Sequence, residues 1–319
     1  MKNVTPDYAQ TFSCIAGRCR HSCCIGWEIG IDDDTLARYR ALPGPFGDRL
    51  RQNITEEDGC ACFRLTGSEE RCPFLNGEGL CDIILTLGED ALCQICTDHP
   101  RFRSYFSDRV ETCPGLCCEE AARLLLASPS PIGLIAEEDA ESASPLSPWE
   151  EHLLSVRGDL LAAAQDPSLP LKERCAHILT SAGYPVSVRA LTDGGSMLRF
   201  LAFLKTLEQL DPAWGTLLSR AENAEIGDPF ADGTWDRYGE KILWYFLFRH
   251  LPAAEDAAGL AVRAAFAVRM CALFLYLIRT AGAVSLPDAA ECARMLSGEI
   301  EYSEDNTAAV LDDLFKALP

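Results

Sequence analysis

Cysteine is the residue whose number and spacing most clearly predict chemistry in this sequence. Thirteen of the sixteen cysteines lie within the first 118 of 319 residues, and they open as Cys14-x4-Cys19-x3-Cys23-Cys24. A thiolate is a soft, strong ligand for zinc or iron. The cysteines therefore predict a bound metal centre, whose binding energy would help to fold a segment that is poor in long apolar periods.

Further cysteine groups follow the opening one. Cys72 begins a CPFL segment, Cys81 lies within GLCDI, and Cys93-x2-Cys96 comes next. The last group, Cys113-x3-Cys117-Cys118, leads into a predicted helix, while Cys60 and Cys62 lie in a separate polar segment. A C-x2-C turn such as Cys93 to Cys96 aims both sulfurs the same way, and several cysteine groups in one segment together indicate a metal centre.

The spacing leaves the identity of the metal open. A zinc knuckle would show two regularly separated C-x2-C pairs, and the radical S-adenosylmethionine spacing C-x3-C-x2-C would need a cysteine at Gly26. Cys23 and Cys24 are adjacent and cannot easily bind one ion together, which favours two centres or one ligand with one bystander. His21 and His99 are better explained as polar loop residues than as ligands.

Composition favours metal over disulfides and limits the classes of partner. The first residues, MKNVTPDYAQTF, lack the apolar region of an export signal, so we expect a reducing cytoplasm, where disulfides do not persist. The most apolar run, Met270–Ile278, is too short to span a membrane. The formal charge of −20 without a basic run argues against nucleic acid and anionic membranes, and suits lysine-bearing partners.

These cysteines need a scaffold, and the apolar patterns predict one of mainly α class. Residues 1–127 are broken by Gly, Pro and Asp, which predicts an irregular cysteine-rich metal-binding domain ending in a helix at Glu119–Ala127. The acidic, Ser/Pro-rich composition near 137–148 places a linker at 128–148. An all-α helical bundle is expected over 149–319.

Helical periodicity runs through that last region. The helices expected are Trp149–Ala164, Leu171–Ala182, Ser196–Leu210, Pro212–Asn223, Trp235–His250, Glu255–Ala281, Leu286–Leu296 and Ser303–Leu318. The aromatic run from Trp244 to Phe248 has helical spacing, which favours core packing over a partner surface.

Several motifs together resemble the flagellin lysine-N-methylase family. The order Tyr8, Phe12, the opening cysteine motif, then Trp27-x-Ile29-x-Ile31-Asp32 is followed by CPFL, GLCDI and Cys96-x2-His99-Pro100-Arg101. CCEEAARLLL at 117–126 and GEIEYSEDN at 298–306 extend the resemblance into both halves of the chain. The first part also resembles a broader class of cysteine-rich zinc- or iron-chelating domains.

The resemblance implies an S-adenosylmethionine-dependent enzyme that methylates surface lysines of flagellin, and an oxygen-sensitive [4Fe-4S] cluster, with zinc as the alternative. The cysteines that match the family pattern are Cys14, Cys19, Cys23, Cys24, Cys72, Cys81, Cys96 and Cys118. The remaining five of the first thirteen are extras of this chain, so the number of centres stays open. The resemblance implies nothing about oligomeric state.

The methyl-donor site is not visible in the sequence. No strand is followed by G-x-G-x-x-G, so a Rossmann-type pocket is not expected. Asp193-Gly194-Gly195-Ser196 before a helix could receive an anionic group, although a turn with a Ser196 cap is the simpler explanation. Methyl transfer needs a neutral lysine amine held in line with the sulfonium. Glu299, Glu301 and Tyr302 are the catalytic candidates for this, the alternative being a solvated helix boundary.

Two other functions fit the same residues. One is a non-catalytic, cysteine-rich zinc- or iron-binding protein with a helical interaction domain. The other is an iron–sulfur redox protein that transfers electrons and no methyl group.

Overall fold

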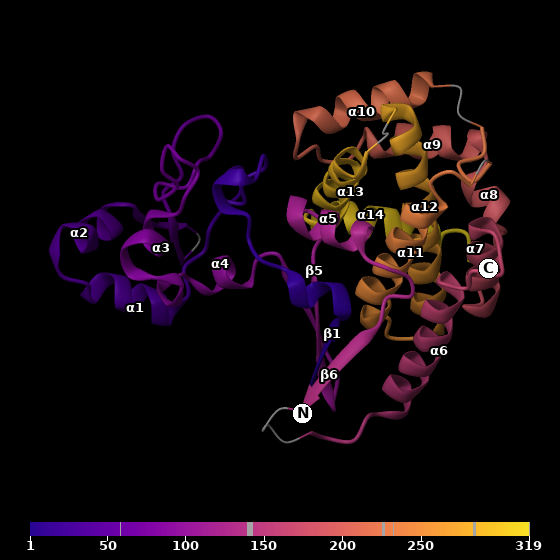
Figure 1. Ribbon diagram of the computed structural model, residues 1–319, viewed down its shortest axis with the longest axis horizontal. Helices are drawn as coiled ribbons and strands as arrows, with labels where there is room; N and C mark the ends of the chain where they lie inside the picture. Colours follow the sequence, from indigo (N-terminus) through magenta and orange to yellow (C-terminus); the bar gives the residue numbers. More distant parts are fainter. Residues whose placement is uncertain (58, 139–142, 225–226, 232, 283–284, 319) are drawn as a thin grey trace. The chain divides into compact units, whose positions relative to one another are not determined.

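The computed structural model describes residues 1–57, 59–138, 143–224, 227–231, 233–282 and 285–318 (Figure 1). The chain forms two compact units. The first, called here the cysteine unit, comprises residues 13–101 and 118–120, and the second, the helical unit, comprises 1–12, 102–117 and 121–319. These limits differ from those expected from composition, and the division into domains at 1–127 and 149–319 stays a prediction.

Short elements joined by loops make up the cysteine unit. Its α-helices are α1 (Asp33–Ala41), α2 (Gly44–Gln52), α3 (Asp82–Leu87) and α4 (Gln94–Asp98), with single 3-10 turns at Ala16–Arg18 and Glu89–Ala91. Strands β2 (Ile54–Glu57) and β3 (Cys60–Phe63) pair antiparallel, with Ile54 opposite Phe63 and Glu57 opposite Cys60. The Asp32 carboxylate caps α1 by accepting from Thr35 N at 2.9 Å, and also accepts from Gln94 N at 2.8 Å.

A small apolar core holds the cysteine unit together. Tyr39, Phe63 and Phe74 lie at its centre, with ring centroids of Phe63 and Phe74 5.0 Å apart. Cys72 and Cys93 are buried in the same core, and Cys24, Cys81 and Cys96 pack against its edge. Five cysteines thus pack in or against this core, in positions that apolar side chains usually fill.

A four-stranded mixed sheet lies in the helical unit, in the order β4-β5-β1-β6. The strands are β1 (Lys2–Pro6), β4 (Arg101–Tyr105), β5 (Arg109–Pro114) and β6 (Leu134–Glu138). β1 runs parallel to β5, with Val4 opposite Glu111, and antiparallel to β6, with Pro6 opposite Leu134. β6 lies within the segment expected to be a linker, whose residues 139–142 are outside those described.

Helices make up most of the helical unit, and the expected mainly α class is confirmed. They are α5 (Glu119–Ala127), α6 (Pro148–Ala164), α7 (Leu171–Ser181), α8 (Val188–Thr192), α9 (Gly194–Leu204), α10 (Pro212–Asn223), α11 (Asp236–His250), α12 (Ala257–Ala281), α13 (Leu286–Glu301) and α14 (Glu304–Phe315), with 3-10 turns at Asp7–Thr11 and Leu251–Ala253. The expected core packing of Trp244 to Phe248 is confirmed, since all these side chains are buried.

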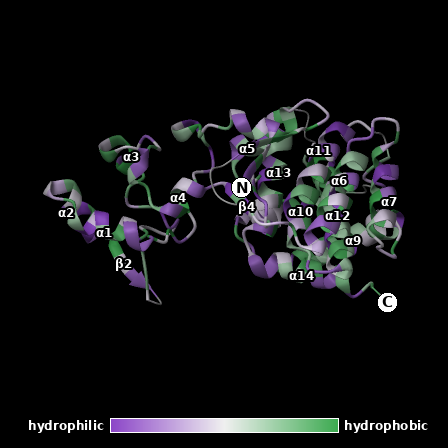
Figure 2. Cartoon of the chain, turned by 90° about the horizontal axis from the view of Figure 1, so that it is seen from below, coloured by the Kyte–Doolittle hydropathy of each residue, from purple (hydrophilic) through white to green (hydrophobic). Residues whose placement is uncertain are grey.

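Helix α12 is the centre of this unit's core. All residues from Ala264 to Ile278 are buried, and the helix packs against α7, α10, α11 and α14. Figure 2 shows its apolar residues in green. Among the described residues, α12 is the single helix that is long enough and apolar enough to cross a membrane. However, 94% of its most apolar stretch is buried inside the protein. Such burial is typical of a core helix.

Candidate functional site

Two regions hold the residues that the sequence analysis singled out. The eight family-matching cysteines all lie in the cysteine unit, and the three catalytic candidates at 299–302 lie in the helical unit. Each region is described by itself.

The opening cysteines lie on loops around a 3-10 turn. Cys14 and Cys23 are exposed, while Cys19 is partly exposed. The Cys19 thiol donates to His21 O at 3.2 Å and lies 3.8 Å from Glu119 Oε2. Arg20 binds the same carboxylate through its backbone N–H at 2.9 Å and its Nε at 3.0 Å. These bonds hold the loop of Cys19 to the residue that follows Cys118.

Burial and neighbouring groups shift the pKa values of these thiols. Burial raises the pKa of Cys19 to about 11, and the charges of Cys118 and Cys14 raise it further. A hydrogen bond to Cys24 raises the pKa of Cys23, to which the charges of Cys14 and Cys118 also contribute. Cys14, Cys19, Cys23 and Cys118 are called here the outer set.

A second neighbourhood lies against the apolar core of the cysteine unit. Cys72 N donates to Cys24 O at 2.8 Å, Leu75 and Cys81 form an isolated antiparallel bridge, and the sulfurs of Cys93 and Cys96 are 3.4 Å apart. Burial raises the pKa of Cys72 to about 12, with contributions from Cys24 and Cys81. The pKa of Cys96 is raised by its hydrogen bond to Cys93 and by the charges of Cys24 and Cys72. Cys24, Cys72, Cys81 and Cys96 are called here the inner set.

The two loops that carry these sets meet at a glycine. A Cβ on Gly17 would lie 2.7 Å from the carbonyl oxygen of Glu78, and one on Gly79 would lie 3.4 Å from Gly17 Cα. Gly79 also has φ +74°, a conformation that favours glycine. The backbone between Cys14 and Cys19 therefore touches the backbone just before Cys81.

The thiols do not converge on one point. Within the ranges that the structure describes, no three Cys, His, Asp or Glu side chains are close enough to hold a single metal ion. Zinc would need sulfurs about 2.3 Å from one ion. The donor chemistry of both sets suits an iron–sulfur cluster, whose ligand thiolates bind different irons of one cluster.

The two histidines near the cysteines differ in their surroundings. The His99 ring lies against Trp27 with centroids 5.8 Å apart, and burial lowers its pKa to about 4. His21 is exposed.

The remaining cysteines are distributed over both units. Cys60 is exposed and Cys62 buried on β3, while Cys113 of the helical unit accepts or donates a hydrogen bond with Tyr8 Oη at 3.3 Å. Burial raises the pKa of Cys113 to about 12. Cys175, Cys271 and Cys292 are buried among the helices of the helical unit, as core residues.

Glu299 has a structural role in the helical unit. Its carboxylate accepts from Leu210 N at 3.0 Å and Asp211 N at 2.6 Å, just before the first turn of α10. Burial raises its pKa despite those two bonds. Helix α13 continues to Glu301, five residues beyond its expected end at Leu296, so these glutamates lie on a helix that packs into the core and not at a solvated boundary.

Glu301 lies at the centre of a buried polar network. Its carboxylate is 0% exposed and accepts from Ser297 Oγ at 2.6 Å, His250 Nε2 at 2.8 Å and Tyr245 Oη at 3.0 Å. Arg249 Nε lies 3.9 Å away. Burial alone would raise the pKa of Glu301, but the His250 bond and the nearby charges lower it overall. Glu301 is therefore held as a carboxylate.

Tyr302 is the most exposed of the three candidates, at 38%. Its ring packs on Phe102 with centroids 5.8 Å apart, and the Arg249 guanidinium lies 3.5 Å above the same Phe102 ring. Its hydroxyl bonds to Cys117, and burial followed by the Cys117 charge raises its pKa well above the ordinary value of 10.0. Of these candidates it can contact a bound molecule most readily.

Sequence reasoning missed Tyr245, His250 and Arg249 as partners of Glu301. The signal was present, because a histidine and an arginine end α11 and a tyrosine lies one turn earlier on the same helix. Their meeting with Glu301 is a contact between residues more than fifty positions apart, which local periodicity does not predict.

The segment Asp193-Gly194-Gly195-Ser196 is a helix start. The Asp193 carboxylate accepts from Ser196 N at 2.7 Å and is the N-cap of α9, so the cap is Asp193 and not the expected Ser196. A carboxylate there disfavours an anionic ligand.

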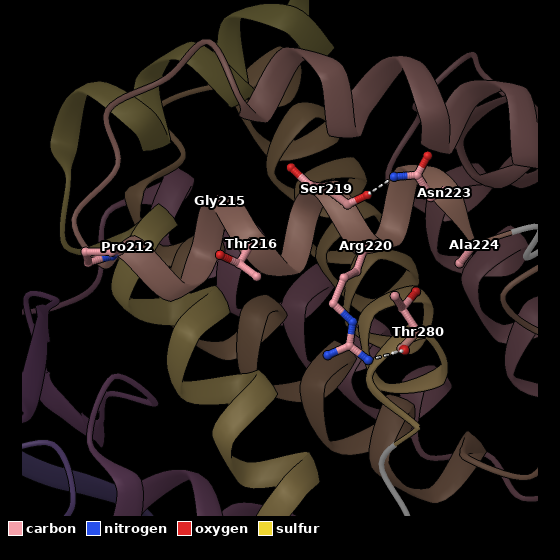
Figure 3. A pocket seen from close by; sticks show the side chains of 8 residues that line it. All are labelled: Pro212, Gly215, Thr216, Ser219, Arg220, Asn223, Ala224 and Thr280. Atoms are coloured by element: carbon pink, nitrogen blue, oxygen red, sulfur yellow. Dashed lines mark hydrogen bonds between the residues drawn. The ribbon is translucent and has the colours of Figure 1, made fainter.

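An open groove of about 720 Å³ lies along α10 and the end of α12 (Figure 3). The Arg220 guanidinium reaches the Thr280 carbonyl at 3.5 Å, and Asn223 donates to Ser219 O at 2.8 Å. Among the described residues that line it, none is a cysteine or a catalytic candidate.

Comparison with known proteins gives a partial match. No family model and no solved structure matches the chain. Proteins named lysine-N-methylase from Salmonella typhimurium strain LT2 and Salmonella choleraesuis strain SC-B67 are each 27% identical over 167 residues. This region covers 49% of the chain and 42% of each relative, so the match spans less than half the length of those relatives.

A third relative matches over more of its own length. The flagellar biosynthetic protein FliU of Salmonella muenchen is 27% identical over 146 residues, which is 42% of this chain and 84% of that protein. Over nearly half of its length, the chain is therefore similar to proteins named for lysine methylation and for flagellar biosynthesis.

Proposed function

We propose that this chain is an S-adenosylmethionine-dependent protein lysine N-methyltransferase that acts on flagellin in the cytoplasm. The observation that carries the proposal is its similarity to two proteins named lysine-N-methylase and to the flagellar protein FliU. The formal charge of −20 favours association with a lysine-bearing protein.

The cysteine unit would hold an iron–sulfur cluster, with zinc as the alternative. The thiolates of the outer and inner sets are the donors. A cluster bound there would stabilise the fold of a unit whose own apolar core is small. When bound, it also supplies a redox-active centre.

Tyr302 is the residue we assign to the lysine amine. A methyl acceptor must be neutral and in line with the methyl group, so the site needs a group that orients the amine through a hydrogen bond. Because the pKa of Tyr302 is raised, its hydroxyl stays protonated and orients the amine without removing a proton. Its exposure lets a substrate side chain reach it.

Glu301 acts as a positioning residue behind Tyr302. It is buried and touches no solvent, so it cannot contact a substrate directly. Its hydrogen bonds to Tyr245 and His250 and its ion pair with Arg249 fix the end of α11. Arg249 in turn packs on Phe102, the ring that supports Tyr302.

The methyl donor is not assigned to particular residues. Among the residues that the structure describes, no glycine-rich loop joins a parallel strand to a helix, and β1 and β5 are the parallel pair of a mixed sheet. A Rossmann-type site therefore does not fit this chain, and no step is derived through the donor.

A labelling experiment tests the proposal. The full chain, purified and reconstituted with iron and sulfide without oxygen, is mixed with flagellin and methyl-labelled S-adenosylmethionine, and methyl-lysine is located by peptide mass spectrometry. We expect label on flagellin lysines, and Tyr302→Phe to reduce the rate tenfold or more, by an order-of-magnitude estimate for one positioning hydrogen bond. Tyr105→Phe is the matched control, because Tyr105 is 73% exposed.

Absence of label on flagellin with the cluster-loaded chain would reject the enzyme and leave a metal-binding or redox protein. Labelling with equal rates for Tyr302→Phe and the wild type would keep the function and reject the assignment of Tyr302.

A further inference from the structure

We infer that Cys93 and Cys96 form a redox-active dithiol, which a low-molecular-weight disulfide such as glutathione disulfide converts to an internal disulfide. Cys96 is the thiol that reacts with the incoming disulfide, and Cys93 is the thiol that completes the exchange. This goes beyond the proposed function and needs neither a bound metal nor methyl transfer.

The two sulfurs are already in contact. Cys93 Sγ lies 3.4 Å from Cys96 Sγ and is hydrogen-bonded to it, and both side chains are free thiols. A disulfide bond is about 2.0 Å long, so the sulfurs need to approach each other by only about 1.4 Å more. The same C-x2-C spacing carries the reactive dithiol of disulfide oxidoreductases.

Hydrogen bonds fix the turn that carries the two thiols. Cys96 N and Thr97 N both donate to Cys93 O, at 3.0 and 3.1 Å, so the two cysteines lie on one closed turn at the start of α4. The Thr97 hydroxyl donates to the same carbonyl at 3.3 Å. The backbone therefore keeps the two thiols side by side.

The chain on either side of Cys93 is also bound to α1 and its cap. Tyr39 Oη donates to Ala91 O at 2.6 Å, and the Asp32 carboxylate accepts from Gln94 N at 2.8 Å. Because these bonds already order the segment, little chain entropy is lost when the two sulfurs join.

The two thiols differ in exposure, which assigns their roles. Cys93 is 0% exposed and lies in the apolar core of the cysteine unit. Cys96 packs at the edge of that core and is partly exposed. An external disulfide therefore reaches Cys96 first, and the buried Cys93 meets the sulfur of Cys96, to which it is already hydrogen-bonded.

The exchange balances in two steps. The Cys96 thiolate attacks one sulfur of glutathione disulfide, so a bond from Cys96 to glutathione forms and one glutathione leaves. The Cys93 thiolate then attacks Cys96 Sγ and displaces the second glutathione. The protein dithiol loses two electrons, the external disulfide gains them, and the two protons end on the two released glutathiones. Excess thiol reverses both steps, so the disulfide is transient in a reducing compartment.

A redox titration of the full chain tests the inference. The reduced chain is kept with a chelator, because a metal on Cys96 would block the exchange, and is equilibrated without oxygen in glutathione buffers of increasing disulfide content. Acid quenching, N-ethylmaleimide and peptide mass spectrometry then report the state of each cysteine. Cleavage after Glu89 and Arg101 isolates residues 90–101, which contain Cys93 and Cys96 and no other cysteine.

We expect the peptide 90–101 to lose both free thiols as one internal disulfide. This should require a glutathione disulfide concentration at least about tenfold below that which modifies half of Cys60, because the second step is intramolecular. Cys60 is the matched reference, since it is exposed and lies on β3. Cys60→Ser should leave the titration of the pair unchanged.

The two single variants should differ from each other. Cys93→Ser should accumulate the glutathione adduct on Cys96, whereas Cys96→Ser should leave the buried Cys93 unmodified. Unfolding of the unit would expose the remaining thiol in both variants and cannot produce this contrast. Equal adducts in the two variants would overturn the order of attack.

A pair that stays free while Cys60 is modified would overturn the inference, as would a disulfide from Cys96 to any cysteine other than Cys93. A chain that forms the internal disulfide but transfers no methyl group would keep the inference and reject the proposed enzyme. Labelled flagellin with an unreactive pair would do the reverse.

Discussion

Removing the Glu301 carboxylate should destabilise the helical unit strongly. Glu301 is fully buried and accepts hydrogen bonds from Ser297, His250 and Tyr245. A hydrogen bond to a charged group contributes about 1.5–3 kcal/mol. Removing one partner of a buried ionic contact costs about 3–5 kcal/mol, because the other groups stay buried without it. These terms overlap, so we expect Glu301→Ala to lower the free energy of unfolding by about 3–5 kcal/mol.

Glu301→Gln should cost less, about 1–3 kcal/mol, because the amide keeps the volume and one acceptor oxygen. Glu304→Gln is the matched control, since Glu304 is exposed in the first turn of α14, and it should change stability by less than about 0.5 kcal/mol. Guanidinium unfolding followed by tryptophan fluorescence measures the helical unit well, because four of the five tryptophans lie in it, namely Trp149, Trp214, Trp235 and Trp244. A cost below about 1 kcal/mol for Glu301→Ala would refute the account of the network.

Three further predictions concern packing and pH. Burial lowers the pKa of His250 below its ordinary 6.5, so the unfolded state binds the proton first as pH falls. The free energy of unfolding should therefore decrease as pH drops below 6.5. His250→Gln should flatten that part of the profile, measured by urea unfolding at several pH values. Gly17→Ala puts a Cβ against Glu78 O and should destabilise the cysteine unit by about 1–3 kcal/mol in thermal unfolding. Gly77→Ala, whose Cβ would meet nothing within 4 Å, is the control and should not. Equal melting temperatures for the two variants would contradict the close approach at Gly17. Arg157 pairs with buried Glu111 at 2.6 Å. In denaturant unfolding, Arg157→Ala should therefore cost about 3–5 kcal/mol, and the double change Arg157→Met with Glu111→Leu much less. Equal costs would argue against a buried unpaired charge as the cause.

The helical part of the fold was predictable because its determinants are local. Pro212–Asn223 and Glu119–Ala127 have the bounds expected from apolar periodicity and capping, and Ser147 and Asp211 cap α6 and α10 as such residues do. Helix α8 was not expected because five residues are too few to show a period. Helix α13 was expected to end before Gly298, yet packing carries it through this glycine to Glu301.

The sheet and the grouping of the sites were less predictable because they depend on distant pairings. β1 pairs with β5 and β6, more than a hundred residues away, and neither partner has a strong strand pattern. The sequence singled out the late motif at 298–306 but not the different roles of its two glutamates. Glu299 binds the backbone before α10 and Glu301 binds side chains of α11, because the two residues point from different faces of α13. The role of these residues in catalysis stays a prediction.

The order of the strands affects how this chain can fold during synthesis. β1 is an inner strand of its sheet, yet residues 13–101 are made before its first partner, β5, leaves the ribosome, and β6 comes later still. Most of the cysteine unit, residues 13–101, is thus an insertion that is made while both edges of β1 are still open. A chain in which this insertion stayed unfolded would face a larger loop-closure entropy between β1 and β5, so assembly of the sheet in the helical unit is coupled to folding of the insertion.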